Sequence, residues 1–210
     1  MGVKERRERE RADVRARILD AARDMFARDG YEAVTMRAIA DRIEYSAPVI
    51  YGHFQDKNAL LQELCFLDFR ALGESFARIG RLLDPVERLR RIGAAYVDFA
   101  LANPAHFRFM FMTPKPYVDD GRMESVRGNP EQDAYAFLCQ TVADAIAADC
   151  LRPEYTDVAR TAQLFWGAAH GIVSLQIAKC DDPWIHWDDA RATALELIEA
   201  VTRGVVRAPA

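Results

Sequence analysis

Signals for the start and end of helices recur along the whole chain and constrain its fold more than any other feature. Residues 12–28 carry apolar side chains three and four positions apart, and Gly30 follows as a stop signal. Three N-cap residues followed by proline predict further helix starts, at Asp84-Pro85, Asn103-Pro104 and Asn129-Pro130. The polar-apolar alternation of strands is almost absent. The sequence predicts an all-α protein of about nine helices, with two long ones near 155–179 and 188–206.

Composition narrows the class of protein. Half of the 210 residues are hydrophobic and 29% are charged, as in ordinary globular proteins. No apolar run approaches the roughly 20 residues that cross a bilayer, and the first 17 residues lack the apolar segment of a secretory signal. We therefore expect a cytoplasmic protein without a membrane partner.

Catalytic and metal-binding patterns are absent from the sequence. The four cysteines lie far apart, and the four histidines show no spacing typical of metal ligands. No nucleophile elbow, phosphate-binding loop or zinc-protease motif occurs. We expect no catalytic residue, no metal and no cofactor. Enzymatic activity remains the less favoured alternative.

Residues 35–54 have the layout of a helix-turn-helix motif. Thr35 precedes one short apolar helix, and Ser46 precedes another that has Pro48 in its first turn. A short helix, a tight turn and a second short helix form the motif. Two such helices bury little surface alone, so we expect the preceding helix and a longer one after Asp56 to brace them.

The turn of this motif, Ile43-Glu44-Tyr45-Ser46, contains no glycine. If the turn keeps the geometry that glycine usually provides, Glu44 must adopt a positive φ, at a cost on the order of 1 kcal/mol. The alternative is a relaxed turn that shifts the second helix slightly. We predict the first alternative, with the Glu44 side chain exposed.

Two stretches resemble a known family. "TMRAIADRIEYSAPVIYGHFQDKNALL" resembles the DNA-binding domain of TetR-family regulators, over residues 12–62. The family pattern is filled by Thr35, Ile39-Ala40, Ser46, Ile50-Tyr51, His53-Phe54, Lys57 and Leu60-Leu61. "FWGAAHGIVSL" resembles the WHG-type C-terminal domain of one subgroup, through Trp166, His170 and Gly171. The resemblance implies a DNA-binding domain over 1–60, with residues 1–11 as a flexible arm. It also implies a helical ligand-binding and dimerisation domain over 61–210.

The resemblance also implies which residues contact double-stranded operator DNA. Phosphate contacts are expected from Thr35, Tyr51 and Lys57. Base contacts are expected around the second short helix, from Arg37, Tyr45, Ser46, Ala47, Pro48 and Val49. The last three are apolar and suit thymine methyl groups, so we assign polar recognition mainly to Arg37.

Several of these assignments have alternatives. Tyr51 contacts phosphate or packs in the core, whereas Phe54 is expected in the core. His53 touches a phosphate or covers the end of its own helix. The first 17 residues hold six arginines. This segment is either a frayed, solvated helix with alternating charges, or it places Arg6, Arg7, Arg9 or Arg11 along the phosphates or in the adjacent minor groove. We favour an arm that is disordered until DNA arrives.

The larger part of the chain is rich in aromatic residues, and the resemblance implies a small hydrophobic or aromatic inducer there. The candidate pocket residues are Phe69, Tyr96, Phe99, Phe107, Phe111, Phe137, Trp166 and His170. His170 is alternatively a packed, hydrogen-bonded histidine.

A homodimer formed by the two last helices is also implied by the resemblance. Its apolar face is expected at Leu175, Ala178, Leu195, Ile198, Val201 and Val205. Such a two-fold dimer predicts a near-palindromic operator. Repression is favoured over activation, and a helical interaction module without DNA binding is the remaining alternative.

Overall fold

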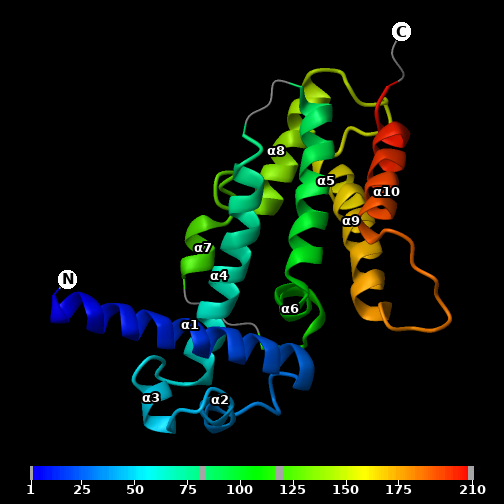
Figure 1. Cartoon of the computed structure of the whole chain (residues 1–210). Helices are drawn as coiled ribbons and strands as arrows, with labels where there is room; N and C mark the ends of the chain where they lie inside the picture. Colours follow the sequence, from blue (N-terminus) through cyan, green and yellow to red (C-terminus); the bar gives the residue numbers. More distant parts are fainter. Residues whose placement is uncertain (1, 81–83, 117–120, 208–210) are drawn as a thin grey trace. The chain divides into compact units, whose positions relative to one another are not determined.

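The computed structural model describes residues 2–80, 84–116 and 121–207, and within these ranges the chain is helical (Figure 1). The elements are α1 Val3–Asp29, α2 Met36–Arg42, α3 Ala47–Tyr51, α4 Lys57–Ala77, α5 Pro85–Ala102, α6 Pro104–Phe107, the π-helical turn η1 Arg108–Met112, α7 Arg122–Val126, α8 Ala134–Ala147, α9 Val158–Lys179 and α10 Ala190–Val205. The described residues form no strand, only one isolated bridge between Leu151 and Val206. The predicted all-α class is confirmed, with ten α-helices in these ranges where about nine were expected.

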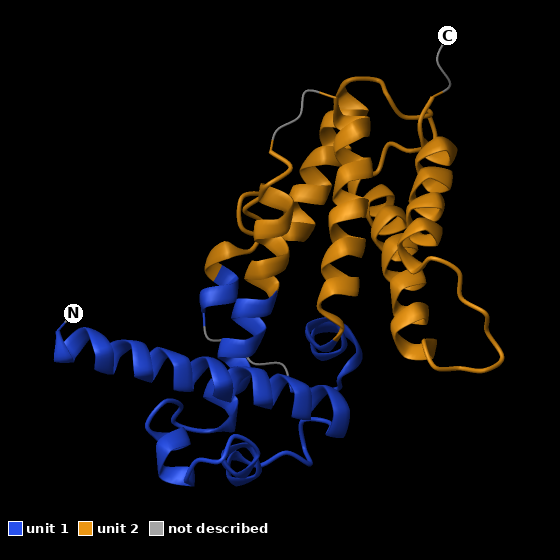
Figure 2. Ribbon diagram, in the orientation of Figure 1, with its two compact units in different colours: residues 1–68, 105–124 blue, residues 69–104, 125–210 orange. Residues whose placement is uncertain are grey.

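The chain divides into two compact units (Figure 2). Residues 1–68 and 105–124 form the first unit, and residues 69–104 and 125–210 form the second. Helix α4 contributes its beginning to the first unit and its end to the second. The expected division of function near residue 60 stays a prediction.

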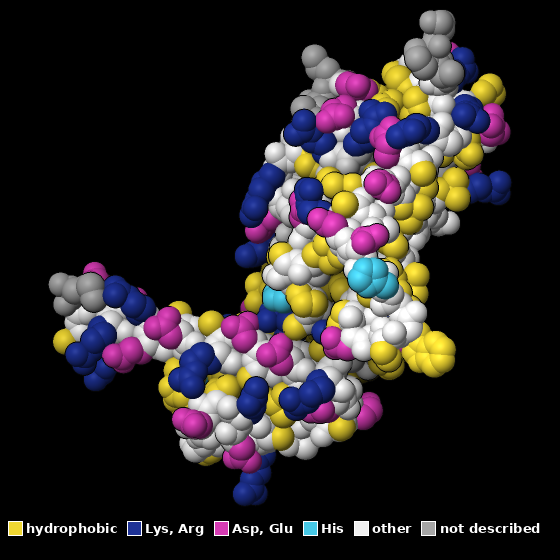
Figure 3. Space-filling view, turned by 45° about the vertical axis from the view of Figure 1, so that its right-hand side comes forward, with side chains coloured by type: hydrophobic (Ala, Val, Ile, Leu, Met, Phe, Trp, Pro, Cys, Tyr) yellow, Lys and Arg dark blue, Asp and Glu magenta, His cyan; other side chains and the backbone are white. Residues whose placement is uncertain are grey.

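Helix α1 begins at Val3, which differs from the flexible arm expected over residues 1–11. Two ion pairs one turn apart stabilise this first part of the helix, Lys4 to Glu8 at 3.9 Å and Arg6 to Glu10 at 3.5 Å. Figure 3 shows basic and acidic side chains alternating along it. The structure therefore agrees with the alternative of a solvated helix with alternating charges.

Three of the predicted N-cap residues, Thr35, Asp56 and Asp84, form the expected side-chain caps. The Thr35 hydroxyl accepts a hydrogen bond from Ala38 N at 3.1 Å, and Asp84 accepts one from Val86 N at 2.9 Å. The start expected at Asn129-Pro130 is wrong, because these residues form a turn. Helix α8 begins four residues later, where Asp133 accepts hydrogen bonds from Tyr135 N and Ala136 N. The aspartate is the better cap because one carboxylate oxygen satisfies two orphan amides.

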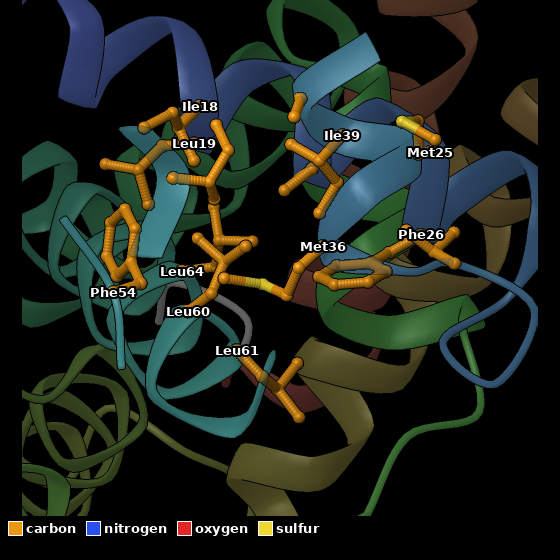
Figure 4. Packing of buried hydrophobic residues seen from close by; sticks show 14 of the residues in the cluster. Ile18, Leu19, Met25, Phe26, Met36, Ile39, Phe54, Leu60, Leu61 and Leu64 are labelled. Carbon is orange, nitrogen blue, oxygen red and sulfur yellow. The ribbon is translucent and has the colours of Figure 1, made fainter. Parts of the chain in front are cut away.

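One hydrophobic core holds the helices of the first unit together and positions the two short ones, α2 and α3 (Figure 4). Ile18 and Phe26 from α1, Ile39 from α2, and Leu60 and Leu64 from α4 are each fully buried in it. Helices α2 and α3 have seven and five residues, too few to be stable in isolation. Their stability therefore comes from this core, as expected from the sequence.

A buried ion pair links α1 and α4 within the same unit. The Arg23 guanidinium of α1 binds both carboxylate oxygens of Asp68 in α4, at 2.9–3.1 Å. Arg23 is 6% exposed and Asp68 1%. His106 of α6 lies with Nδ1 3.0 Å from the same carboxylate. Arg23 also binds the exposed carboxylate of Asp20 at 2.8 Å. Because Arg23 and Asp68 are both removed from water, losing Asp68 leaves the buried guanidinium with this exposed partner in place of a buried one.

We predict that Asp68→Asn lowers the free energy of unfolding by about 3 kcal/mol, because the Arg23 charge then stays buried without its main partner. Urea unfolding of the two proteins measures the difference. Asp29→Asn is the matched control, since it removes the same charge from the exposed Arg28–Asp29 pair and should leave stability nearly unchanged. Equal small effects of both substitutions would contradict the prediction.

Candidate functional site

The glycine-free turn after α2 adopts the geometry that glycine usually provides. Glu44 has φ 61°, in the left-handed region. Its amide donates to Asp41 O at 3.2 Å, and the Tyr45 amide donates to Ala40 O at 3.0 Å. These two bonds form a Schellman motif, with Glu44 at the position glycine most often occupies. The Glu44 side chain is exposed. Both parts of the prediction for Glu44 are confirmed.

Helix α3 follows at once and presents its first turn to solvent. Ser46 is the N-cap residue with extended backbone, but its hydroxyl makes no capping hydrogen bond within the described chain. The expected side-chain cap is therefore absent, and Pro48 stabilises the first turn through its fixed φ instead. Ser46 and Pro48 are exposed, so this end of α3 is accessible to a partner.

The ten predicted DNA-contact residues fall into two groups by exposure. The exposed ones are Thr35, Arg37, Ser46, Pro48 and Tyr51, and the partly buried ones are Tyr45, Ala47, Val49, His53 and Lys57. Tyr51 is 55% exposed, which fits a surface contact and excludes the core position considered for it. Phe54, at 4% exposed, lies in the core as expected.

Arg37 stands in the first turn of α2 with its side chain exposed. It forms no hydrogen bond or ion pair with the described residues, so its donors are available to an external acceptor. Lys57 differs. Its ammonium donates to Tyr31 O at 2.9 Å and Val34 O at 3.0 Å, and lies 4.1 Å from the Tyr31 ring centre. Two of its three donors thus support the loop before α2.

Three arginines of α1 hold the ends of the two short helices. Arg11 donates to Gly52 O at 3.3 Å and Arg15 to His53 O at 3.2 Å, both at the end of α3. Arg17 donates to Ile43 O at 3.0 Å, at the end of α2. Cations at helix C-termini satisfy orphan carbonyls and complement the helix dipole. This bracing role was missed in the sequence analysis, where Arg11 was assigned to solvent or DNA.

The i, i+4 spacing of Arg11 and Arg15 was the available signal, since it puts both on one face of α1. The same two arginines influence His53. Burial, followed by the charges of Arg11 and Arg15, lowers the pKa of the His53 imidazole below its ordinary value. A neutral His53 lies beside the end of α3, and both earlier interpretations of its side chain stay open.

Three of the predicted pocket residues form a polar cluster in the second unit. The Tyr96 hydroxyl of α5 lies 2.8 Å from His170 Nδ1 of α9, and Trp166 Nε1 donates to the Tyr96 oxygen at 3.3 Å. Burial raises the pKa of the Tyr96 hydroxyl and lowers the pKa of His170. The arrangement therefore favours a Tyr96 O–H that donates to a neutral imidazole. His170 is hydrogen-bonded and packed, as the alternative to a ligand contact predicted.

The other pocket candidates are divided between the units. Phe69, Phe99 and Phe137 are partly buried in the second unit. Phe107 and Phe111 belong to the first unit, with ring centroids 5.1 Å apart. Tyr96, Trp166 and His170 are the candidates that share hydrogen bonds in the described contacts. Trp166 is 39% exposed, so the cluster reaches the surface of its unit.

Two family profiles match the chain. A profile described as "Bacterial regulatory proteins, tetR family" matches residues 18–64, and one described as "Tetracyclin repressor-like, C-terminal domain" matches residues 89–201. The chain belongs to the TetR family. The members are transcriptional regulators rather than enzymes, and the chain carries their DNA-binding helix-turn-helix. The WHG subtype of the C-terminal domain stays a prediction.

Individual relatives agree with the family. The transcriptional regulator UidR of Escherichia coli K12 is 26% identical over 170 residues, which cover 76% of this chain and 80% of UidR. The repressor KstR of Mycobacterium tuberculosis is 39% identical over 84 residues, 40% of this chain and 33% of KstR. The structure of the TetR-family regulator PfmR of Thermus thermophilus shares the fold, with a TM-score of 0.70, 22% identity and coverage of 89% of this chain and 97% of PfmR.

In the part of the chain that the structure describes, no helix is long and apolar enough to cross a membrane. Nor do the described residues include a group of three or more potential metal ligands.

We predict that Arg37→Ala loses about 1–3 kcal/mol of discrimination at one base pair, because Arg37 is exposed in the first turn of α2 and has its donors available to a base edge. Competition binding with single-base variants of a selected duplex measures the loss. Arg42→Ala, at the other end of α2, is the matched control and should leave the base preference unchanged. Equal losses on selected and random DNA would identify Arg37 as a phosphate contact.

We predict that stability falls more steeply on acidification in the wild type than in His170→Asn. Because burial depresses the folded pKa of His170 below 6.5, the unfolded chain takes up the proton first. The contribution of neutral His170 to the free energy of unfolding is therefore present above pH 6.5 and is lost as the pH falls through the folded pKa. Urea unfolding at a series of pH values measures both slopes. His53→Asn is measured in parallel, because His53 is the second histidine with a lowered pKa. Identical slopes for wild type and His170→Asn would contradict the prediction.

Proposed function

We propose that the chain is a repressor that binds a near-palindromic operator as a homodimer and leaves it when a small hydrophobic or aromatic ligand binds. The observation that carries the proposal is the exposed first turn of α3. It follows directly on the turn in which Glu44 has a left-handed backbone conformation. A recognition helix must offer its N-terminal residues to the major groove in a fixed direction. The core, the Schellman turn and the α1 arginines supply that rigidity.

The DNA contacts proposed are those that remain exposed. Arg37, Ser46 and Pro48 lie at the starts of α2 and α3, where base edges would be met. Thr35 and Tyr51 are exposed beside them and suit phosphate contacts. Tyr45 and Lys57 are engaged within the protein, so we assign them supporting roles with at most one further hydrogen bond to DNA.

An apolar surface on α9 and α10 supports the homodimer. Leu164 and Leu175 of α9 are 45% and 55% exposed, and Leu197 of α10 is 36% exposed. Gly167 and Gly171 share the face of Leu164 and Leu175, and a Cβ at either would meet no atom within 4 Å. Small residues on an open apolar helix face allow close packing against a second helix pair. A second copy of the chain provides that pair.

The predicted composition of this face needs one correction. Ile198 and Val205 are 4% and 3% exposed, so they belong to the core of their own chain. A Cβ at Gly93 of α5 would lie 2.8 Å from Ile198, which shows how closely α10 packs there. The apolar stripe of α10 points at α5, and Leu197 one position earlier replaces Ile198 on the proposed dimer face.

The ligand would be hydrophobic with few polar groups. The Tyr96–His170–Trp166 cluster is the part of the second unit best able to recognise one polar atom, since it combines two O–H or N–H groups with aromatic rings. A ligand acceptor that takes the Trp166 N–H would release it from Tyr96. The cytoplasmic location and the repressor direction stay predictions; KstR, similar over 40% of this chain, is a repressor.

Selection of bound fragments from the source genome tests the proposal. We expect duplexes with two symmetrical half-sites about one helical turn apart, and repression of a reporter placed behind them. Neighbouring genes would then indicate the ligand class. A chain that selects no sequence would overturn the proposed function, and reporter activation would overturn the repressor assignment.

We predict that Leu175→Glu converts a dimer to a monomer and weakens operator binding at least tenfold, because a charge would be buried in the proposed interface. Sedimentation equilibrium and a gel shift measure the two effects. Ala192→Glu adds the same charge at an exposed position of α10 outside the apolar face and should leave both unchanged. A dimeric Leu175→Glu protein would place the interface elsewhere.

A further inference from the structure

We propose that Arg17 is a positioning residue for DNA recognition: it holds the glycine-free turn in its strained conformation and thereby fixes the start of α3. The inference rests on the proposed function of α3. It assigns to an α1 arginine a role inside the protein rather than on the phosphate backbone.

The first observation is the carbonyl of Ile43. In the Schellman motif, the carbonyl of Ala40 accepts the Tyr45 amide and that of Asp41 accepts the Glu44 amide. Ile43 is the C-cap residue, and its carbonyl belongs to the orphan groups that a helix end leaves. Arg17 Nη2 donates to this oxygen at 3.0 Å. The residue before Glu44 is therefore held from α1.

The second observation is the side chain of Tyr45. Arg17 Nη1 lies 3.4 Å from the Tyr45 hydroxyl, and the guanidinium carbon is 5.2 Å from the centre of the Tyr45 ring. The Tyr45 side chain packs on the core of the first unit as well. One guanidinium thus contacts the residue before and the residue after Glu44.

These contacts depend on the left-handed conformation. The Ile43 carbonyl and the Tyr45 side chain meet one guanidinium because the chain reverses at Glu44, with φ 61°. In a relaxed turn with negative φ, the two groups would point in different directions, and Arg17 would keep at most one of them. A group that binds one conformation better than another shifts the population toward it. Arg17 therefore offsets the strain of a non-glycine residue at this position.

The consequence for recognition follows from the short distance along the chain. Ser46, the N-cap of α3, is the next residue after Tyr45, and α3 begins at Ala47. A change of φ at Glu44 would move all the proposed base contacts of α3 together. Glycine at this position would adopt the same turn without strain. The requirement for Arg17 should then disappear.

The experiment uses the full chain and a duplex selected from a random pool by the wild-type protein, with a shuffled duplex as the nonspecific probe. Arg17→Ala should weaken binding to the selected duplex about fivefold, the factor that corresponds to one strained residue. Adding Glu44→Gly to Arg17→Ala should restore affinity to within about twofold. Glu44→Gln removes the same charge but keeps the strain, so it should give no restoration.

Arg11→Ala is the matched control. Arg11 is also an exposed arginine of α1 that donates to a helix-end carbonyl, Gly52 O at 3.3 Å, but it lies away from the turn. Glu44→Gly should not restore binding in Arg11→Ala. Restoration of both arginine variants to the same extent would overturn the proposal, because the glycine would then act through charge or general stability.

Salt dependence separates positioning from a direct DNA contact. If Arg17 acts through the turn, the slope of log K against log salt stays the same in Arg17→Ala. A slope smaller by about 0.9, with no restoration by Glu44→Gly, would show a phosphate contact and overturn the proposal.

A DNA-free measurement makes failure of this inference distinct from failure of the proposed function. Hydrogen exchange of the Tyr45 amide, which bonds to Ala40 O at 3.0 Å, reports the Schellman turn directly. Arg17→Ala should speed this exchange about fivefold, the same factor as for binding, and the added Glu44→Gly should reverse the change. Unchanged exchange would overturn the role of Arg17, whatever the DNA experiments give. Failure of the wild type to select any duplex would overturn the proposed function alone.

Discussion

Helices α2 and α3 are too short to exist without the side chains that surround them, and the recognition function depends on how they are held. Two kinds of interaction hold them. Apolar contacts with α1 and α4 fix which face of each short helix is buried, with Ile39 and Ile50 fully enclosed. Hydrogen bonds from α1 to the carbonyls at the ends of α2 and α3 then fix their direction. The first supplies most of the stability, and the second supplies orientation.

The cations of α1 illustrate how one residue type serves two purposes. A segment rich in arginine next to a helix-turn-helix suggests electrostatic attraction to DNA, and its exposed members remain suited to that purpose. Arg11, Arg15 and Arg17, however, bind carbonyl oxygens of the protein itself. Their charge is thereby held near the proposed DNA surface, at a helix end where it complements the helix dipole. Bracing and attraction are thus assigned to different arginines of the same segment.

Local features could be predicted well from the sequence. The caps at Thr35 and Asp84 and the left-handed Glu44 depend on interactions among residues close together in the chain. The exposure of Arg37 and the burial of Phe54 are likewise decided within one short motif. Predictions that failed involved a competing local choice, as where Asp133 rather than Asn129 caps α8. The arm expected to be flexible over residues 1–11 is helical from Val3, because its alternating charges form ion pairs one turn apart that support an exposed helix.

By itself, the sequence determined the helix-turn-helix, its strained turn and the all-α class, since each is encoded by neighbours within a few residues. Tertiary structure alone decided which partners distant side chains take. It turned Ile198 and Val205 toward α5, bound Lys57 to the carbonyls of Tyr31 and Val34, and brought Tyr96 to His170. Apolar periodicity identifies a buried stripe but not the surface that covers it, and a cation does not specify its acceptor. Those choices depend on how complete helices pack against one another.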